Sequence, residues 1–278
     1  MDRFLMAACL AAALFLSACS GGHGTVGSTN TASGNGNPAG ATPVTPQAST
    51  AALFQPLAGI LPYPTDLYFA GSTDGTLNIQ PENALMPSQA AINALDGFST
   101  TAVIRARFGG PLDPASLTAQ SVIVLQVTID NTTKATTNVV RLLVFGVDYT
   151  TGVGPEAGVG NTILEIRPTH PLVPSTGTVN NGYLVLLTNA IKDTAGKAAT
   201  ADTDFATIKA ALPTCSTITD TSLHGICQLT GAHLQIAHFI GLDPADVVLS
   251  FSFSTQSIPD DRVSFVRRFG PFFTGGDG

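Results

Sequence analysis

Charged residues are scarce in this sequence, and basic residues are scarcer than acidic ones. Of the 278 residues, 11% are charged, and the formal net charge is −7. Because no basic face is available to neutralise phosphates, we do not expect a nucleic-acid partner. Hydrophobic residues make up 44% of the chain, so it can bury a sizeable core, and its surface must be largely neutral and polar.

Long apolar segments are also missing beyond the N-terminus, where none reaches the roughly 20 residues that cross a bilayer. The run Phe4–Leu16 is shorter and follows the basic Arg3, which is typical of a signal-peptide core. It ends in Leu16-Ser-Ala-Cys19, which resembles the lipobox of bacterial lipoproteins. In those proteins a lipid is added to the cysteine thiol before the chain is cut ahead of it. We therefore expect a signal peptide over residues 1–18 and lipidation of Cys19. The alternative is an ordinary secretory signal that contains a cysteine.

Aromatic and charged residues are absent between Ser20 and Thr50. Such a segment has too little apolar surface to offset the entropy lost on ordering, so we expect residues 19–52 to form a disordered linker. As a flexible coil it would span roughly 30 Å. Ser20, directly after the predicted lipidation site, resembles the outer-membrane sorting pattern. The sequence therefore predicts an outer-membrane lipoprotein, anchored by its lipid, whose domain faces the periplasm or the cell surface.

Two cysteines remain for the body of the chain. Cys9 would leave with the signal peptide and Cys19 would carry the lipid, which leaves Cys215 and Cys227. In an oxidising compartment these two are a natural disulfide pair. Closing the short loop between them would stabilise the fold by about 3 kcal/mol.

A metal site is not expected. His233 and His238 follow the second of these cysteines, but residues five apart on a helix point about 140° away from each other, so they do not share a face. Aspartates in turns are usually present for their local backbone hydrogen bonds. Calcium binding would require several of them to converge, which the sequence leaves open. The turn aspartates are Asp74, Asp96, Asp113 and Asp193.

Most of the chain has the pattern of β-strands. The clearest alternation lies in 247–254, where Val247, Leu249, Phe251 and Phe253 alternate with three serines. Several short strands with turn signals between them favour an all-β sandwich. The other predicted strands are 102–108, 121–129, 139–145, 163–166 and 183–187. The predicted turns are 109–111, 152–160, 168–174 and 193–196.

Helical spacing interrupts this pattern once. Phe205, Ile208 and Leu212 recur at helical intervals before Pro213. A second helix is predicted over 229–240, closed by a glycine in the position that comes after a helix end. We expect a helical insertion over 202–242, in which the disulfide joins the two helices.

Several segments carry a resemblance to known families. Phe108–Leu117, Arg167–Leu172 and Lys192–Gly196 resemble motifs of bacterial Ig-like domains. Leu61–Asn78, Asn93–Thr101 and Ser252–Ser257 narrow the match to the N-terminal domain of bacterial virulence-factor lipases. That family includes lipoproteins of the outer-membrane lysophospholipase type. The resemblance covers about residues 53–257 and implies an Ig-like β-sandwich, into which the disulfide-stapled helices expected above would be inserted. Residues 258–278 are expected to form an irregular tail.

The resemblance also implies that catalysis belongs to a different domain. In the family, this domain precedes an α/β-hydrolase domain whose catalytic serine lies in a G-x-S-x-G elbow. No G-x-S-x-G occurs in this sequence, so we predict no catalytic residue and no cofactor. The predicted function is a non-catalytic accessory domain, truncated or stand-alone, whose lipase catalytic domain lies on a separate or missing segment. A lipase or esterase acting on lysophospholipids, and an Ig-like adhesion or ligand-binding module, are the alternatives.

Overall fold

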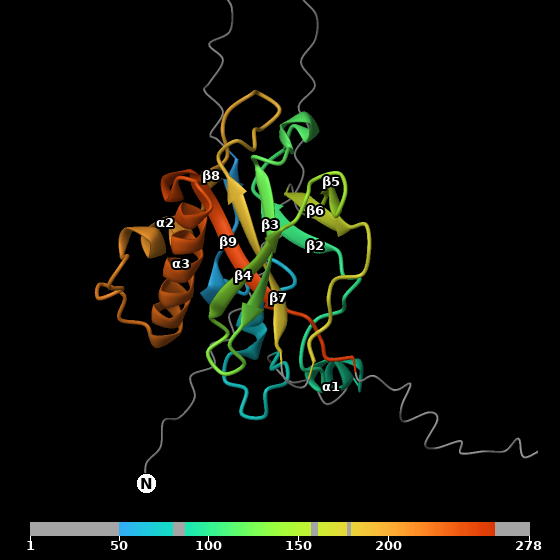
Figure 1. The fold of residues 1–278 in the computed structure, drawn as a ribbon. Coiled ribbons are helices and arrows are strands. Elements are labelled where there is room, and N and C mark those ends of the chain that lie inside the picture. The colour runs from blue at the N-terminus through green and yellow to red at the C-terminus, as the bar shows by residue number, and fades with distance from the viewer. Residues whose placement is uncertain (1–49, 80–86, 157–160, 177–178, 259–278) are drawn as a thin grey trace, which may run out of the picture. The chain divides into compact units, whose positions relative to one another are not determined.

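The computed structural model of the protein describes residues 50–79, 87–156, 161–176 and 179–258 (Figure 1). The predicted signal peptide, Cys19, nearly all of the predicted linker, and the tail beyond Ile258 lie outside these residues. Within the described ranges, no helix is both long enough and apolar enough to cross a membrane.

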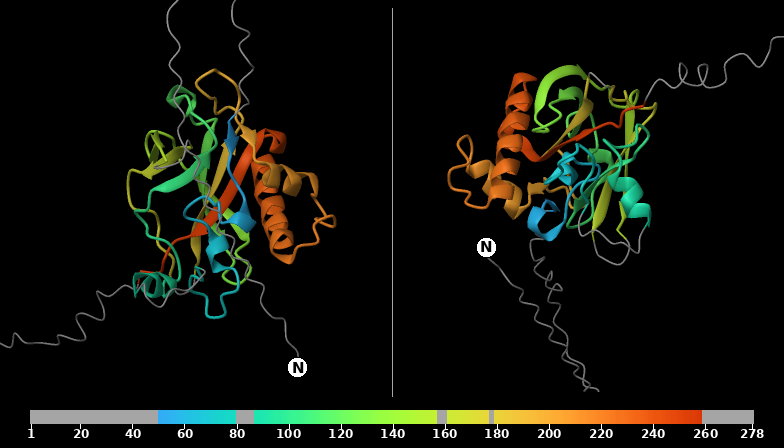
Figure 2. Two further views of the ribbon diagram at one scale, coloured as in Figure 1. Left: turned by 180° about the vertical axis from the view of Figure 1, so that it is seen from behind. Right: turned by 90° about the horizontal axis from the view of Figure 1, so that it is seen from below.

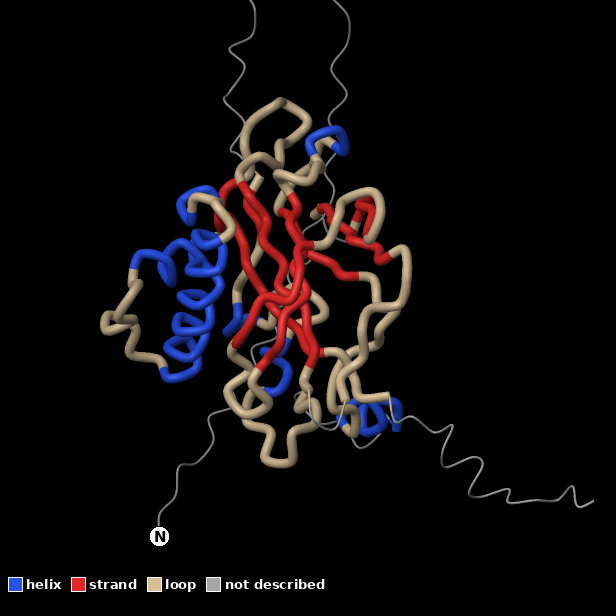
Figure 3. Tube along the Cα trace, viewed as in Figure 1, coloured by secondary structure: helices blue, strands red, loops and turns tan. Residues whose placement is uncertain are grey.

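Two β-sheets form the centre of the fold (Figure 3). One has the strand order β4-β3-β7-β9, and each strand in it is antiparallel to its neighbours. The other has the order β5-β6-β2-β1-β8, in which β1 and β8 run parallel and the remaining neighbours antiparallel. The first sheet comprises β3 (Val122–Ile129), β4 (Thr136–Leu142), β7 (Asn181–Thr188) and β9 (Val247–Ser254). The second comprises β1 (Ala51–Ala52), β2 (Ile104–Phe108), β5 (Tyr149–Pro155), β6 (Thr162–Pro168) and β8 (Thr200–Ala201). The predicted mainly β, two-sheet class is confirmed.

Strand β2 shows how the sequence alternation builds the core. Every second side chain from Ile104 to Phe108 is buried, and the two arginines between them point outward. Arg105 pairs with Glu165 at 3.0 Å, and Arg107 pairs with Glu156 at 2.6 Å. The apolar face therefore enters the core while the charged face stays in contact with solvent.

One predicted turn proves to be part of a strand. The glycines near 152 indicate a turn in the sequence, but β5 continues through Gly152, which pairs with Glu165 of β6. A Cβ atom at this position would come within 2.5 Å of Nη1 of Arg167. The nearest atom belongs to the end of a flexible arginine side chain, which can shift, so this glycine is compatible with a strand and does not mark a turn.

The helical insertion is confirmed, and it lies against one side of the four-stranded sheet. Helices α2 (Thr203–Ala210) and α3 (Thr221–Phe239) stay beside β9 in every view (Figures 1 and 2). The Cys215–Cys227 disulfide fastens the segment after α2 to α3, with a Cα–Cα distance of 6.0 Å. Helix α3 begins eight residues before the predicted start, because Asp220 caps it by accepting from the N–H groups of Ser222 and Leu223.

Short helical segments connect the sheets. A helix of seven residues, α1 (Pro87–Asn93), comes after a gap in the described residues. In the part of the chain that the structure describes, four 3₁₀ turns lie in the loops: η1 (Pro56–Ala58), η2 (Asp66–Phe69), η3 (Pro114–Ser116) and η4 (Pro244–Asp246). Of these, η2 has the largest part in the candidate site, because it places Asp66 beneath strand β9.

Candidate functional site

The serines of β9 do not face solvent. Ser250, Ser252 and Ser254 lie on the face opposite the phenylalanines, and each is at most 4% exposed. Helix α3 and η2 cover this face. A buried hydroxyl group costs free energy unless it has a hydrogen-bond partner. Helix α3 and η2 each supply one titratable side chain as such a partner.

His233 is the partner that α3 supplies. Its Nδ1 lies 3.3 Å from Oγ of Ser250, and its Nε2 lies 3.2 Å from Oγ of Ser252. The side chain is buried, and burial lowers the pKa of His233 to about 4. The imidazole is therefore neutral at pH 7, with both ring nitrogens engaged by serines.

Asp66 is the partner that η2 supplies. Its carboxylate accepts a hydrogen bond from the backbone N–H of Ser254 at 2.7 Å and from the Ser254 hydroxyl at 2.9 Å. Burial raises the pKa of Asp66 to about 6, and the two Ser254 bonds oppose that shift. Asp66 thus ties the start of the described chain to its end.

These groups do not form a hydrolase triad. A triad needs a histidine with one nitrogen toward the serine and the other held by a carboxylate. Here both nitrogens of His233 face serines, and the carboxylate of Asp66 bonds Ser254. The serine–histidine contacts are buried beneath α3. In the described residues, the arrangement fastens α3 and η2 to β9.

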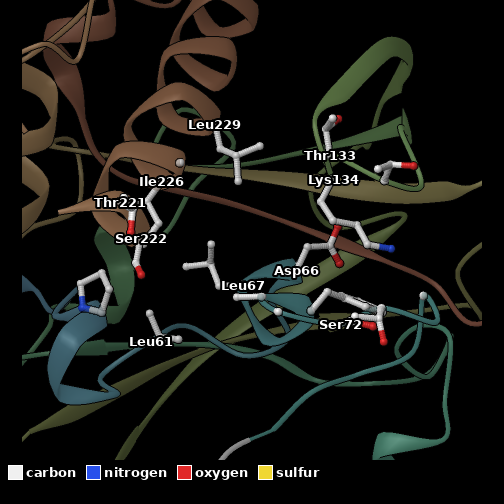
Figure 4. Close-up of a pocket in the computed structure, with 18 of the residues that line it drawn as sticks. Leu61, Asp66, Leu67, Ser72, Thr133, Lys134, Thr221, Ser222, Ile226 and Leu229 are labelled. Atoms are coloured by element: carbon white, nitrogen blue, oxygen red, sulfur yellow. The ribbon is translucent and has the colours of Figure 1, made fainter. Parts of the chain in front are cut away.

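A large cavity opens beside this buried network. It has a volume of about 880 Å³ and lies between η2, the turn that joins β3 to β4, and the first half of α3 (Figure 4). Aliphatic side chains gather on one side of it, with Thr221 and Ser222 beside them, and the other side is polar. The apolar side is formed by Leu61, Leu67, Ile226 and Leu229; the polar side includes Asp66, Ser72, Asp74, Asn131, Thr132, Thr133 and Lys134.

Lys134 is the cation of the polar side. It lies in the β3–β4 turn with a φ of 56°, and its side chain is buried. Its ammonium lies 3.8 Å from the centre of the Phe69 ring and 3.4 Å from Oδ1 of Asn131. Burial lowers the pKa of Lys134, and the nearby charge of Asp66 opposes this shift more than any other group does.

The cysteines and histidines singled out in the sequence lie in different parts of the structure. Cys215 and Cys227 form the predicted disulfide, and Cys19 lies outside the described residues. Neither of the other two histidines of α3 joins His233 on the serine face, since His224 contacts Gln228 and His238 is exposed.

Three of the four turn aspartates bond the local backbone, as predicted, whereas Asp96 accepts from the backbone N–H of Ser257, 161 positions away. Asp74 accepts from Thr76, Asp113 caps η3, and Asp193 accepts from Ala195 and Lys197. Among the described residues, no group of three histidine, cysteine or acidic side chains could hold a metal ion.

The residues that sequence reasoning missed are Asp66, Lys134 and the role of His233. Asp66 follows Pro64-Thr65, and Thr65 caps η2, so the local signal is that of a helix start and not of a buried acid. Lys134 lies in a polar turn, Asn131–Ala135, where a lysine is normally solvated. Neither has a sequence signal for burial, because the elements that cover them come from distant parts of the chain.

Comparison with known proteins identifies the family. Neither the curated proteins nor the solved structures contain a match to this chain. The family model described as bacterial virulence factor lipase N-terminal matches residues 61–266, which is more than half of the chain. This agrees with the motifs that suggested the same family from the sequence. The protein belongs to the family of bacterial virulence factor lipase N-terminal domains.

Proposed function

We propose that this chain is a non-catalytic accessory domain of a bacterial lipase, tethered to the outer membrane by a lipid on Cys19. The family match over residues 61–266 is the observation that carries the proposal. The domain would hold a lipase catalytic domain, on the same or another chain, close to its lipid substrate. The lipobox and the charge-free linker support the tether.

The geometry of the buried network favours an accessory role over hydrolysis. An esterase needs a serine that a substrate can reach and oxyanion donors beside it. The serines of β9 bond inward to His233 and Asp66, and both of these side chains are about 4% exposed. The serine hydroxyls are thus engaged in fastening α3 and η2 to β9.

A hydrolysis assay separates the accessory role from the esterase alternative. Purified protein is incubated with a p-nitrophenyl ester and with a lysophospholipid. We expect no turnover above the buffer blank. Turnover that a single replacement, Ser252→Ala or Ser254→Ala, abolishes in a folded variant would overturn the accessory role.

The partner is tested by affinity capture from an envelope extract of the producing bacterium. We expect the retained protein, identified by mass spectrometry, to carry a G-x-S-x-G hydrolase domain. Retention of a different surface ligand, with no hydrolase, would instead favour an adhesion module.

The tether is tested by metabolic labelling with an alkyne fatty acid. We expect the wild-type chain to be labelled and the Cys19→Ala variant to remain unlabelled. A wild-type chain without label would contradict the lipid anchor and leave the accessory role to be judged by the capture experiment.

A further inference from the structure

The cavity beside η2 has an apolar wall made by two separate elements. Leu61 and Leu67 come from the N-terminal part of the domain, and Ile226 and Leu229 come from α3. All four are half-buried, and Figure 4 shows Leu229 and Leu67 approaching each other from opposite sides. Ligand sites typically measure about 300–1,000 Å³ and are lined largely by apolar side chains. The volume of about 880 Å³ lies in this range, and the aliphatic part of the lining offers contacts to an alkyl chain.

The opposite end of the cavity is polar and contains two buried titratable groups. Asp66 is 4% exposed and Lys134 is 7% exposed, and the charge of Asp66 acts on the ammonium of Lys134. The carboxylate of Asp66 accepts two bonds from Ser254, and a carboxylate can accept about four. The amide of Asn131 and neighbouring hydroxyls add further donors and acceptors. A ligand at the polar end of the cavity would therefore find both hydrogen-bond donors and hydrogen-bond acceptors.

The charges at the polar end decide which head group fits. The charged lining residues are Asp66, Asp74 and Lys134, which gives a net charge of −1 when all are ionised. An anionic head would be repelled by this lining. A quaternary ammonium head would need an aromatic face, and the ammonium of Lys134 already occupies the face of Phe69. A neutral head with several hydroxyl groups can both donate to the carboxylates and accept from the lysine.

Gly225 lines the cavity on the side of α3, at a position that leaves room for a side chain. It lies in the lining, in the interior of a helix, where glycine costs about 1 kcal/mol relative to alanine. A Cβ atom built on it meets nothing within 4 Å. By contrast, a Cβ on Gly231 of the same helix would come within 3.0 Å of Leu212. The second glycine is explained by close packing, whereas the first faces open space.

From these observations we propose that the cavity binds a neutral, single-chain amphiphile of the monoacylglycerol class. The acyl chain would lie along Leu61, Leu67 and Leu229. The glycerol head would lie between Asp66 and Lys134. This binding goes beyond the accessory role proposed above and does not depend on it, since it requires no lipase domain.

The test is isothermal titration calorimetry on the chain from Ser20 to Gly278, which carries no attached lipid. All the contacts that define the cavity lie within residues 50–258, so this chain retains them. The ligand is 1-decanoylglycerol below its micelle concentration. Sodium decanoate, decyltrimethylammonium and glycerol serve as ligands that lack the head group or the chain. We expect saturable binding of one 1-decanoylglycerol, and at least tenfold weaker binding of each of the other three.

Matched variants of α3 locate the site. Gly225→Phe places a large side chain in the cavity and should weaken binding at least tenfold. Gln235→Phe puts the same side chain on an exposed position of the same helix, outside the lining, and should bind like the wild type. Gly225→Leu is the second choice if the phenylalanine variant does not fold, as judged by circular dichroism. Lys134→Met keeps the packing on Phe69 and removes the charge, and should weaken binding several-fold.

Three outcomes would overturn the proposal. The first is the absence of saturable binding to the folded wild-type chain. The second is equal affinity of the wild type and the folded Gly225 variants, which would place the ligand elsewhere. The third is equal or tighter binding of decanoate or decyltrimethylammonium, or an unchanged affinity in Lys134→Met, which would contradict the assigned head group. None of these results bears on the lipase partner, because no lipase is present in the titration.

Discussion

The two faces of β9 are both buried, but they are buried by different means. On the inner face, Phe253 stacks on Tyr183 with ring centroids 5.7 Å apart and meets Phe98 edge-on at 6.4 Å. On the outer face, serines bond His233 and Asp66 beneath α3 and η2. The inner face is held by apolar area and dispersion, and the outer face by hydrogen bonds to titratable groups. One strand can therefore belong both to a permanent core and to a pH-dependent contact.

The largest effect is expected on the inner face. Phe253→Ala removes a side chain that is 0% exposed and leaves a cavity between the sheets. We expect a loss of about 3–5 kcal/mol in the free energy of unfolding, measured by urea denaturation. The loss should be the same at pH 5 and pH 8, because no titratable group is removed. A loss of about 1 kcal/mol is the typical cost of an ordinary substitution. A smaller loss in Phe253→Ala would show that the inner face of β9 does not contribute more to stability than the outer face.

The outer face is expected to respond to pH in two opposite directions. The folded pKa of Asp66 is raised to about 6 from 3.8, so its contribution is fully present below pH 3.8 and is lost as pH rises through about 6. The folded pKa of His233 is lowered to about 4 from 6.5, so its contribution is present above pH 6.5 and is lost as pH falls through about 4. Each shift corresponds to about 3 kcal/mol.

Variants separate these two contributions. Between pH 4 and pH 7, the stability of Asp66→Asn relative to wild type should rise by about 3 kcal/mol, because the variant lacks the charge that is costly to bury. Over the same window, the stability of His233→Gln relative to wild type should fall by about as much. Urea denaturation at several pH values measures both. If the free energy of unfolding varied with pH in the same way for the variants and the wild type, Asp66 and His233 would have unshifted pKa values in the folded protein.

The disulfide should fasten the cover of the outer face without affecting the inner one. Replacing Cys215 and Cys227 together by serine should cost about 3 kcal/mol, since the closed loop is short and the bond acts mainly on the unfolded chain. Thermal unfolding followed by circular dichroism measures the loss. The near-ultraviolet spectrum of the inner-face aromatic residues should not change, and the reduced wild type should match the variant. An unchanged melting temperature would contradict this role.

A single hydroxyl on the outer face should have a smaller effect. Ser252→Ala removes the partner of the His233 Nε2 atom, and leaving a buried polar atom unpaired costs about 1–3 kcal/mol. The matched control is Ser222→Ala, where the serine is exposed and the change should stay within about 0.5 kcal/mol. Equal effects of the two variants would mean that the serine face contributes no specific bonds.

The strands and the helical insertion were predictable, because their signals are local. The alternation in β9 and the helical spacing of Phe205 and Ile208 both indicate the correct elements. The function of the serine face was not predictable. Alternating serines indicate only that one face is polar, and whether water or α3 covers that face is decided by packing between segments distant in sequence.

The cavity was hidden from the sequence for the same reason. Its walls come from η2, from the turn near Lys134, and from α3, which lie far apart along the chain. The turn residue Lys134 has the pattern of a solvated loop, and Gly225 has the pattern of a weak helix position. Only their arrangement in space gives these residues a shared role.

The bonds between Asp66 and Ser254 also have a consequence for how the protein is made. They join residues 188 positions apart, and β9, which has neighbours on both faces, is the last strand of the described chain. At about 5–20 residues per second, a ribosome needs roughly 10–40 s to add that strand after Asp66 has emerged. During this time the acid has no hydroxyl partner and the Phe253 site in the core is empty. The fold can therefore be completed only after β9 has been made.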